Sequence, residues 1–283
     1  MRTKICFFPF VLLSFLPSCS PVKEERVLYT SFAPIAEFAE DIAGSHYEVK
    51  CLTPKGGEPH DYEITPRQLQ GVESSTLLFV NGLGIESYLS SLPESISKKT
   101  VVLSDGLKTR KVDGVEDPHI WLSPRLAYQE CETIANKLIE VDPDNKADYE
   151  SNLASLKTKF DTLDTSYKEA TATFTQKYVL VAHAAFGYLC DDYGLTQLYV
   201  SGLSPEAEPS AKQLQTLLED VKKYSLTTIF YEENVSGDVS KKIADATDLK
   251  TETLATMESD EGNGKTYFDK SRENLEKLKE ACK

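Results

Sequence analysis

Residues 142–174 read DPDNKADYESNLASLKTKFDTLDTSYKEATATF and divide the chain into two parts. Asp142 followed by Pro143 predicts the start of a helix, because aspartate caps free amides and proline loses no hydrogen bond at the first helical position. Apolar side chains then recur mostly at steps of three and four, at Tyr149, Leu153, Leu156, Phe160, Leu163, Tyr167 and Phe174. A helix reaching residue 173 would be on the order of 45 Å long. It would join two lobes stiffly, or else lie on the surface of a single domain.

Short runs of β-branched and apolar residues alternate with helical patterns on both sides of this segment. Before it, we expect strands at residues 26–30, 48–52, 76–80 and 100–103, with helices at 35–42, 66–73 and 86–92. After it, we expect strands at residues 178–182, 197–200, 227–231 and 250–254, with helices starting near Phe186, Ser210, Ser236 and Lys265. The repetition predicts an α/β fold of two lobes, each a mostly parallel four-stranded sheet flanked by helices, joined by one long rigid helix. The lobes would cover residues 26–141 and 175–283.

The composition is that of a folded acidic protein. Hydrophobic residues make up 40% of the 283 residues, which excludes a disordered chain. Lysine and arginine number 31 against 45 acidic residues, so the net charge is −14. Nucleic acid is therefore excluded as a partner, because its phosphates would be repelled.

The first residues have the pattern of an export signal. Arg2 and Lys4 precede the apolar run of residues 5–17, which is too short to span a bilayer well, and residues 1–18 are therefore interpreted as a signal peptide. Leu16-Pro17-Ser18-Cys19 resembles a bacterial lipobox, which implies lipidation of Cys19 and a tether at residues 19–25; the alternative is a secretory signal with a chance cysteine. Two acyl chains would hold the protein on a membrane, in the cell envelope outside the cytoplasm.

Four cysteines remain in the body of the chain, in an oxidising compartment. Four cysteines allow three disulfide connectivities, and none of them has the Cys-x-x-Cys spacing of a zinc site. We expect Cys51 and Cys131 to be small buried hydrophobes, and a bridge between Cys190 and Cys282 stays open.

Three of the four histidines follow predicted strands or precede a predicted helix. His60 lies in the loop after the strand that ends at residue 52, His119 precedes a helix that Ser123 could start, and His183 ends a strand. Ligands of open α/β sheets bind at the carboxyl ends of strands, so the three imidazoles would meet in a cleft between the lobes. Spacing alone does not prove this, since scattered histidines are more often surface or core residues. His46 is interpreted as a surface histidine.

Four segments, when they occur together in this order, are typical of one family. GxEPHDYExTP, DPHxWLSP, AHxAFGYLxxDYGL and GLSPEAEPSAKQL begin at residues 56, 117, 182 and 202. They resemble the zinc-binding branch of the metal ABC-transporter substrate-binding lipoproteins, the ZnuA/AdcA-like group. The resemblance covers nearly the whole mature chain, and it implies a metal ion in the cleft with His60, His119 and His183 as ligands. It implies Glu258 as the fourth ligand, with Asp260 or a water as alternatives, because residues 260–264 depart from the family pattern.

The resemblance also implies a function. The protein would capture Zn²⁺ outside the cytoplasm and deliver it to an ABC permease and its ATPase, most simply as a monomer and not as an enzyme. The manganese branch has a carboxylate where His183 stands, and imidazole suits zinc better than manganese. Zinc affinity should fall below the imidazole reference pKa near 6.5. Residues 107–117 are short and contain no histidine, so a metal-gathering role for them is unsupported.

Other functions are compatible with the same histidines or with the same fold. A zinc hydrolase could also use three histidines, but neither an HExxH helix nor a general base is evident. A surface adhesin, or a Mn²⁺ or Fe²⁺ binder, could be built on the same fold.

Four acidic residues near the predicted ligands have two interpretations each. Glu58 and Asp61 could orient the ring of His60 or be solvated loop acids. Glu232 and Glu233 could form salt bridges or line the cleft.

Overall fold

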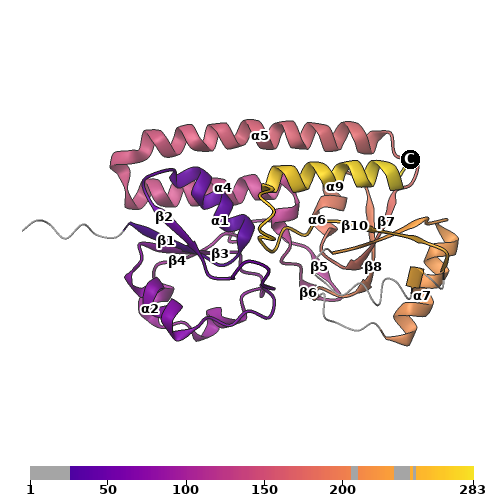
Figure 1. Cartoon of the computed structure of the whole chain (residues 1–283), viewed down its shortest axis with the longest axis horizontal. Coiled ribbons are helices and arrows are strands. Elements are labelled where there is room, and N and C mark those ends of the chain that lie inside the picture. Colours follow the sequence, from indigo (N-terminus) through magenta and orange to yellow (C-terminus); the bar gives the residue numbers. More distant parts are fainter. Residues whose placement is uncertain (1–25, 205–209, 233–242, 245–246) are drawn as a thin grey trace, which may run out of the picture.

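The computed structural model describes residues 26–204, 210–232, 243–244 and 247–283. The predicted signal peptide, Cys19 and the tether lie outside the described residues, as do Glu233 and the start of the helix expected from Ser236; residues 243–244 and 247, farther along, are helical. The described part forms two lobes side by side under one long helix (Figure 1). Within these ranges, none of the helices combines the length and the apolar character that crossing a membrane requires.

The first lobe is built on a four-stranded parallel sheet in the order β2-β1-β3-β4. Its central strands are buried because they consist almost entirely of apolar residues, as in LLFV at β3. The strands are β1 (Val27–Thr30), β2 (Glu48–Cys51), β3 (Leu77–Val80) and β4 (Thr100–Val102). The helices are α1 (Ala33–Ala43), α2 (Pro66–Ser74), α3 (Glu94–Ser97) and α4 (Pro124–Val141).

The second lobe repeats this architecture, with a four-stranded parallel sheet in the order β10-β9-β7-β8. Its strands are β7 (Tyr178–His183), β8 (Thr196–Ser201), β9 (Thr228–Tyr231) and β10 (Lys250–Thr253). Its helices are α6 (Gly187–Asp192), α7 (Ala211–Lys223) and α9 (Tyr267–Ala281). The predicted fold class is therefore confirmed, with every expected strand at its place.

The long helix begins later than predicted. A 3₁₀ turn, η3 (Pro143–Asn145), precedes α5 (Lys146–Ala172), and Asp142 does not cap it with its side chain. The Asp142 carboxylate instead accepts hydrogen bonds from Arg26 at 2.6 Å, Tyr149 at 2.6 Å and Asn145 at 2.7 Å. The helix is about 40 Å long at 1.5 Å per residue. Its predicted apolar stripe is buried at Tyr149, Leu156, Phe160, Leu163 and Tyr167.

Three local details differ from the expectation. Residues 86–92 contain a 3₁₀ helix, η1 (Ser87–Ser91), in place of an α-helix. The segment at 107–117 forms an antiparallel hairpin of β5 (Lys111–Val112) and β6 (Val115–Glu116). A further 3₁₀ turn, η2 (Ile120–Leu122), separates His119 from α4, whose first turn is capped by the Ser123 hydroxyl, as the sequence suggested.

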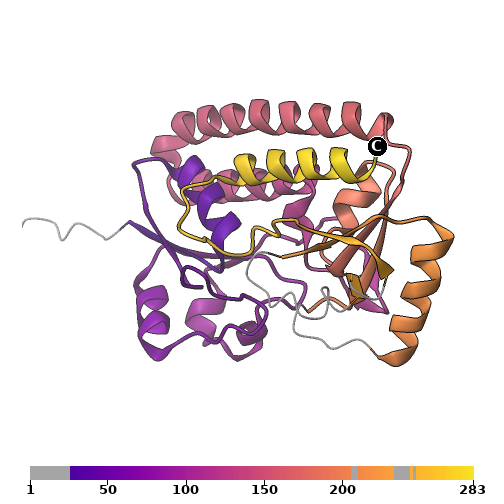
Figure 2. The same ribbon diagram turned by 45° about the vertical axis from the view of Figure 1, so that its right-hand side comes forward.

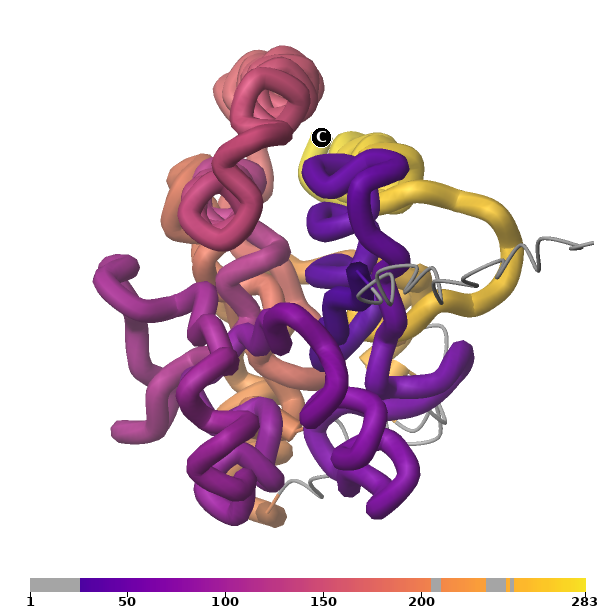
Figure 3. The backbone as a smooth tube through the Cα atoms, turned by 90° about the vertical axis from the view of Figure 1, so that its left-hand side faces the viewer, coloured from indigo at the N-terminus to yellow at the C-terminus, as the bar shows by residue number. Residues whose placement is uncertain are grey.

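One apolar core joins the two lobes through α5 and α9. Phe160 of α5 packs against Phe38 of α1 and Phe268 of α9, with ring centroids 5.8 and 4.8 Å apart. The Tyr267 hydroxyl of α9 donates to the carbonyl of Trp121 in the first lobe at 2.7 Å. Figure 2 shows α9 running beside α5, and Figure 3 shows both on one side of the sheets, together with α1 and α4. The lobes are therefore held by shared helices, which fits a stiff connection.

The four cysteines of the described chain are free, so the bridge between Cys190 and Cys282 is not formed. Cys131 is buried as predicted, but the prediction for Cys51 is wrong because this residue is exposed. Cys51 ends β2, which is an edge strand of its sheet, and that position leaves the residue open to solvent.

Candidate metal centre

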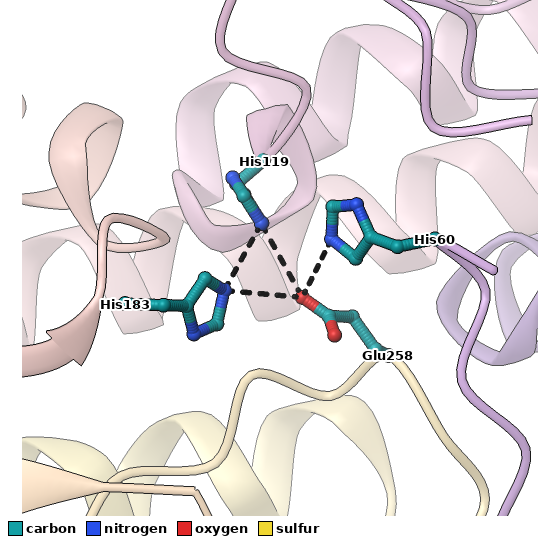
Figure 4. A group of neighbouring side chains, drawn as sticks. All are labelled: His60, His119, His183 and Glu258. Atoms are coloured by element: carbon teal, nitrogen blue, oxygen red, sulfur yellow. Dashed lines mark hydrogen bonds and ion pairs between the residues drawn. The ribbon is translucent and has the colours of Figure 1, made fainter. Parts of the chain in front are cut away.

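Four side chains from both lobes converge in the cleft, as Figure 4 shows. His60 comes from the loop after β2, His119 immediately precedes η2, His183 ends β7 and Glu258 comes from the loop after β10. Parallel strands bring loops from distant parts of the chain to the same edge, so the histidines meet as the sequence predicted. One ligand atom of each residue lies within 4.8 Å of the corresponding atoms of the other three.

Four of the six separations between these atoms are close to those of a tetrahedral zinc site. Glu258 Oε1 lies 3.4 Å from His119 Nε2, 3.8 Å from His60 Nε2 and 3.9 Å from His183 Nε2. His119 Nε2 and His183 Nε2 are 3.3 Å apart. A tetrahedral ion with bonds of about 2.0–2.1 Å holds its ligand atoms about 3.3–3.4 Å apart. Of these four pairs, two already have this spacing and two are wider by roughly half an ångström. The two remaining separations, from His60 to His119 and to His183, are within 4.8 Å, so His60 would have to move closer to the other histidines on binding an ion.

The site is buried, and two of its polar atoms have no hydrogen-bond partner. His119, His183 and Glu258 are at most 3% exposed, while His60 is half-buried. His60 Nε2 and Glu258 Oε1 are buried without a hydrogen-bond partner. A buried polar atom without a hydrogen bond or a bound ion costs free energy of folding. A cation placed between these two atoms would satisfy both.

The alternative ligand Asp260 is directed elsewhere. Its carboxylate pairs with Lys55 Nζ at 2.8 Å and is about half exposed. It also accepts a hydrogen bond from the main-chain nitrogen of Gly262 at 2.7 Å. Glu258, not Asp260, therefore faces the three histidines in the structure.

Two carboxylates hold the far nitrogens of the imidazole rings. Asp117 Oδ1 lies 2.8 Å from His119 Nδ1, and Glu232 Oε1 is hydrogen-bonded to His183 Nδ1. These contacts turn each Nε2 toward the centre, which is the usual arrangement around a metal. Glu232 was among the acids considered for the cleft. Asp117 was missed, although it stands two residues before His119 in a segment already recognised as important.

The acids beside His60 have other roles. Glu58 accepts a hydrogen bond from the main-chain nitrogen of His60 at 3.1 Å, so its contact is with the backbone of the loop and not with the ring. Asp61 is exposed. His46, the remaining histidine, pairs with Asp148 at 2.8 Å on the outside of the molecule, as expected for a surface histidine.

The electrostatics of the site favour a bound positive charge. Burial alone would lower the pKa of His119, but the hydrogen bond with Asp117 and the nearby Glu258 carboxylate outweigh it and raise the pKa to about 9. Burial alone would raise the pKa of Glu258, but its contacts with His119, His60 and His183 hold that pKa well below its usual value. Without metal, a proton on His119 therefore supplies the positive charge that Glu258 and Asp117 require.

Side chains from outside the loop hold the loop that carries Glu258. Asn274 donates to the carbonyl of Ala255 and accepts from its nitrogen, both at 2.8 Å. Trp121 Nε1 donates to the carbonyl of Thr256 at 2.7 Å, which links this loop to the turn that follows His119. Met257 adopts a left-handed conformation with φ of 62°, which is unfavourable for a residue with a side chain. The position of Glu258 thus depends on tertiary contacts.

A cavity of about 580 Å³ opens beside the site. Its lining includes Glu37, Lys55, Glu258, Asp260 and Tyr267. Of the four converging residues, Glu258 alone lines this cavity.

Comparison with known proteins identifies the family. Residues 28–281 match the family described as ZnuA, zinc-uptake complex component A, periplasmic. The chain belongs to this family. It is 32% identical to the high-affinity zinc uptake system protein ZnuA of Bacillus subtilis, over 89% of this chain and 86% of that protein. The sequence resemblance and the predicted family are thereby confirmed.

Two streptococcal proteins are also similar. The zinc-binding lipoprotein AdcA of Streptococcus pneumoniae is 34% identical over 94% of this chain, which spans 58% of AdcA. The Zn(II)-bound structure of the ZnuA-like domain of AdcA superimposes with a TM-score of 0.80, at 33% identity, covering 91% of this chain and 99% of that domain. The laminin-binding protein Lmb of Streptococcus agalactiae, described as an adhesin with metal-transporting activity, gives a TM-score of 0.86 at 30% identity, covering 91% and 100% of the two chains.

These relatives are named for binding and transport, not for catalysis. Membership of their family supports the expectation that the chain is not an enzyme, and it removes the reason to consider a zinc hydrolase. The same comparisons leave the adhesin alternative in place, because one similar structure is described as both an adhesin and a metal transporter.

Proposed function

We propose that this protein captures Zn²⁺ in the cleft between its lobes, with His60, His119, His183 and Glu258 as ligands. The observation that carries the proposal is the convergence of four ligand atoms within 4.8 Å of one another in a buried site. The Zn(II)-bound structure of the similar ZnuA-like domain supports the choice of metal. Zinc is the cargo here, and its release would complete the transport step.

The donor set favours zinc over manganese. Three imidazoles and one carboxylate form a common environment for tetrahedral zinc, while manganese prefers oxygen ligands. Zn²⁺ and the Glu258 carboxylate together carry a charge of about +1. Asp117 and Glu232, which are hydrogen-bonded to the far nitrogens of the His119 and His183 rings, offset this charge. Copper ranks above zinc in intrinsic affinity, so copper is the competitor to include in binding assays.

The delivery partner would be an ABC permease with its ATPase. Family membership in a zinc-uptake complex supports this assignment. We further propose that residues 1–18 are a signal peptide, that Cys19 carries a lipid and that residues 19–25 tether the protein outside the cytoplasm. Residues 26–141 and 175–283 would form the lobes and 142–174 the linking segment, and the protein would act as a monomer.

Adhesion is a second candidate function, because the similar structure of Lmb is described as that of a laminin-binding adhesin. Adhesion would use the outer surface and not the buried histidines. Immobilised laminin offered to the wild type and to a His60→Ala, His183→Ala double variant separates the two functions. Equal laminin binding by both proteins, with zinc lost only in the variant, would show that adhesion is independent of the metal.

The direct test titrates the metal-stripped protein with Zn²⁺, Mn²⁺ and Cu²⁺. We expect one zinc ion per chain, with manganese bound more weakly. The His60→Ala, His183→Ala double variant should lose this site, and His46→Ala is the matched control because His46 lies on the outer surface. Zinc retention by the double variant equal to that of the wild type would refute the site.

A further inference from the structure

Arg110 lies in the segment at 107–117, for which the sequence indicated no role in collecting metal. The β5–β6 hairpin folds this segment back on itself, and Asp117 N donates to the carbonyl of Arg110 at 2.9 Å. The pairing brings the Arg110 side chain next to the Asp117 carboxylate. Arg110 is therefore one contact away from His119.

The two oxygens of the Asp117 carboxylate contact different residues, His119 and Arg110. Oδ1 lies 2.8 Å from His119 Nδ1 and accepts from His119 N at 3.1 Å, while Oδ2 accepts from Arg110 Nη1 at 2.9 Å. The Asp117 side chain is fully buried, so its charge depends on this arginine and on the His119 ring. A buried carboxylate that loses its cation is left poorly paired and would turn toward another partner. This change would remove the support behind the imidazole of His119.

Arg110 also reaches the second lobe. Its Nε lies 3.0 Å from Asp191 Oδ2 in α6, and its guanidinium carbon lies 5.8 Å from the centre of the Tyr188 ring. The Tyr188 hydroxyl accepts from Arg110 N at 3.1 Å and donates to the carbonyl of Asp117 at 2.7 Å. The support of His119, a first-lobe residue, is thus connected to the helix that follows His183.

Gly187 provides the space for this arginine. A Cβ atom at Gly187 would lie 1.5 Å from Arg110 Nη1 and 2.3 Å from Cζ. Gly187 is the first residue of α6 and is not among the residues with positive φ, so alanine fits its backbone and favours the helix. Gly187→Ala would therefore displace the Arg110 guanidinium without removing the residue.

We propose that Arg110 is a positioning residue for zinc, which holds Asp117 so that His119 Nε2 faces the ion, in a space that Gly187 leaves open. The inference rests on the proposed capture of zinc. An arginine suits the position because its planar fork offers nitrogens to Asp117 and Asp191 at once, which a lysine does not.

The test compares zinc dissociation constants of full-length variants, by competition with a fluorescent chelator at pH 7.5. Loss of a residue that supports a metal-ligating side chain lowers metal affinity about 10- to 100-fold. We therefore expect Arg110→Ala and Gly187→Ala each to bind zinc about tenfold more weakly. Because both substitutions break the same contact, the double variant should be no weaker than Arg110→Ala alone. Additive losses would overturn the shared mechanism.

Two controls match these substitutions. Arg125→Ala removes another arginine pair with α6, to Asp192 at 2.9 Å, which has no contact with the proposed ligands. Gly202→Ala adds a methyl group with no atom within 4 Å. Both variants should stay within twofold of the wild type. An equal loss of affinity in Arg125→Ala would show that any lobe-bridging pair matters and would overturn the specific role of Arg110.

A spectroscopic measurement separates positioning from a general loosening of the fold. With Co²⁺ in place of zinc, the visible absorption reports ligand geometry, and it should change in Arg110→Ala and Gly187→Ala but not in the controls. Unchanged spectra and affinities in both variants would overturn the proposal while leaving zinc capture intact. A wild type that binds no zinc would overturn the proposed function itself. If Arg110→Ala does not fold, Gly187→Ala decides the question.

Discussion

Because a proton competes with zinc for the His119 ring, zinc affinity should depend on pH well above the pH range in which histidine ordinarily titrates. In the absence of metal, Asp117 and Glu258 raise the pKa of His119 to about 9, against the opposing effect of burial. Zinc binds the neutral ring, so the ion must displace this proton at any pH below that value. The pH range over which protons weaken zinc binding, expected from the reference pKa near 6.5, therefore moves upward by about 2.5 pH units.

The magnitude follows from the pKa. At pH 7 the ring is protonated about 100 times more often than it is neutral, which costs about 3 kcal/mol of apparent binding energy. The apparent Kd should rise about tenfold for each pH unit lost between 9 and 7. The zinc-free protein should lose stability as pH rises from 6.5 through 9, because the raised pKa stabilises the fold only while the ring is protonated.

The assay measures the apparent zinc Kd from pH 6.5 to 9.5 by competition, corrected for protonation of the competing chelator. Calorimetry in buffers of different ionisation enthalpy should show about one proton released per zinc at pH 7.5 from this ring. His46→Ala should keep the full pH dependence, since its ring pairs with Asp148 away from the site. A constant Kd between pH 7 and 9, with no proton released, would refute the reasoning.

Three further predictions concern stability and the loop that carries Glu258. Zinc at 1,000 times its Kd should raise the free energy of unfolding by about 4 kcal/mol, visible as a higher Tm by calorimetry, and an unchanged Tm would count against binding to the folded state. Trp121→Phe removes the bond to the carbonyl of Thr256, worth about 1 kcal/mol, and should speed zinc release about fivefold in a chelator chase; identical release would show that this bond does not hold the loop. Burial raises the pKa of Glu37 to about 7, although Tyr267 N donates to both its oxygens and opposes the rise. Protonated Glu37 should stabilise the fold fully below pH 4.5, and this contribution should be lost as pH rises through about 7. The loss amounts to about 2 kcal/mol after allowance for the partial exposure of the side chain. In Glu37→Gln, the denaturation midpoint should therefore depend less on pH over that range.

The fold was predictable because its signals are local and repeated. Buried parallel strands are short continuous apolar runs, such as LLFV at residues 77–80, and each is followed by a helical pattern. The hairpin at 111–116 also had a local signal that was overlooked, since Asp113-Gly114 between two valines favours a tight turn and both residues have positive φ. The histidines were predictable as a group because they stand where strands end.

Other features depend on contacts between distant residues. The late start of α5 follows from Arg26, 116 residues away, which with Tyr149 and Asn145 occupies the Asp142 carboxylate that would otherwise cap the helix. Whether Asp117 or Glu58 supports a histidine ring depends on how each loop turns, which spacing does not reveal. The direction of Glu258 is set by Asn274 and Trp121, since its own loop has no regular hydrogen-bond ladder.

The two lobes share a core, and this limits how the cargo can leave. Phe160 packs against α1 and α9 at once, so a wide rotation of one lobe would expose apolar surface that is buried in both. The loop carrying Glu258 is held by side-chain hydrogen bonds from Trp121 and Asn274 in place of a sheet ladder, and its Met257 is in an unfavourable conformation. Withdrawal of Glu258 would leave the ion on three neutral rings and open it to the adjacent cavity. Release through this loop would leave Phe160 packed between α1 and α9, whereas separation of the lobes would not.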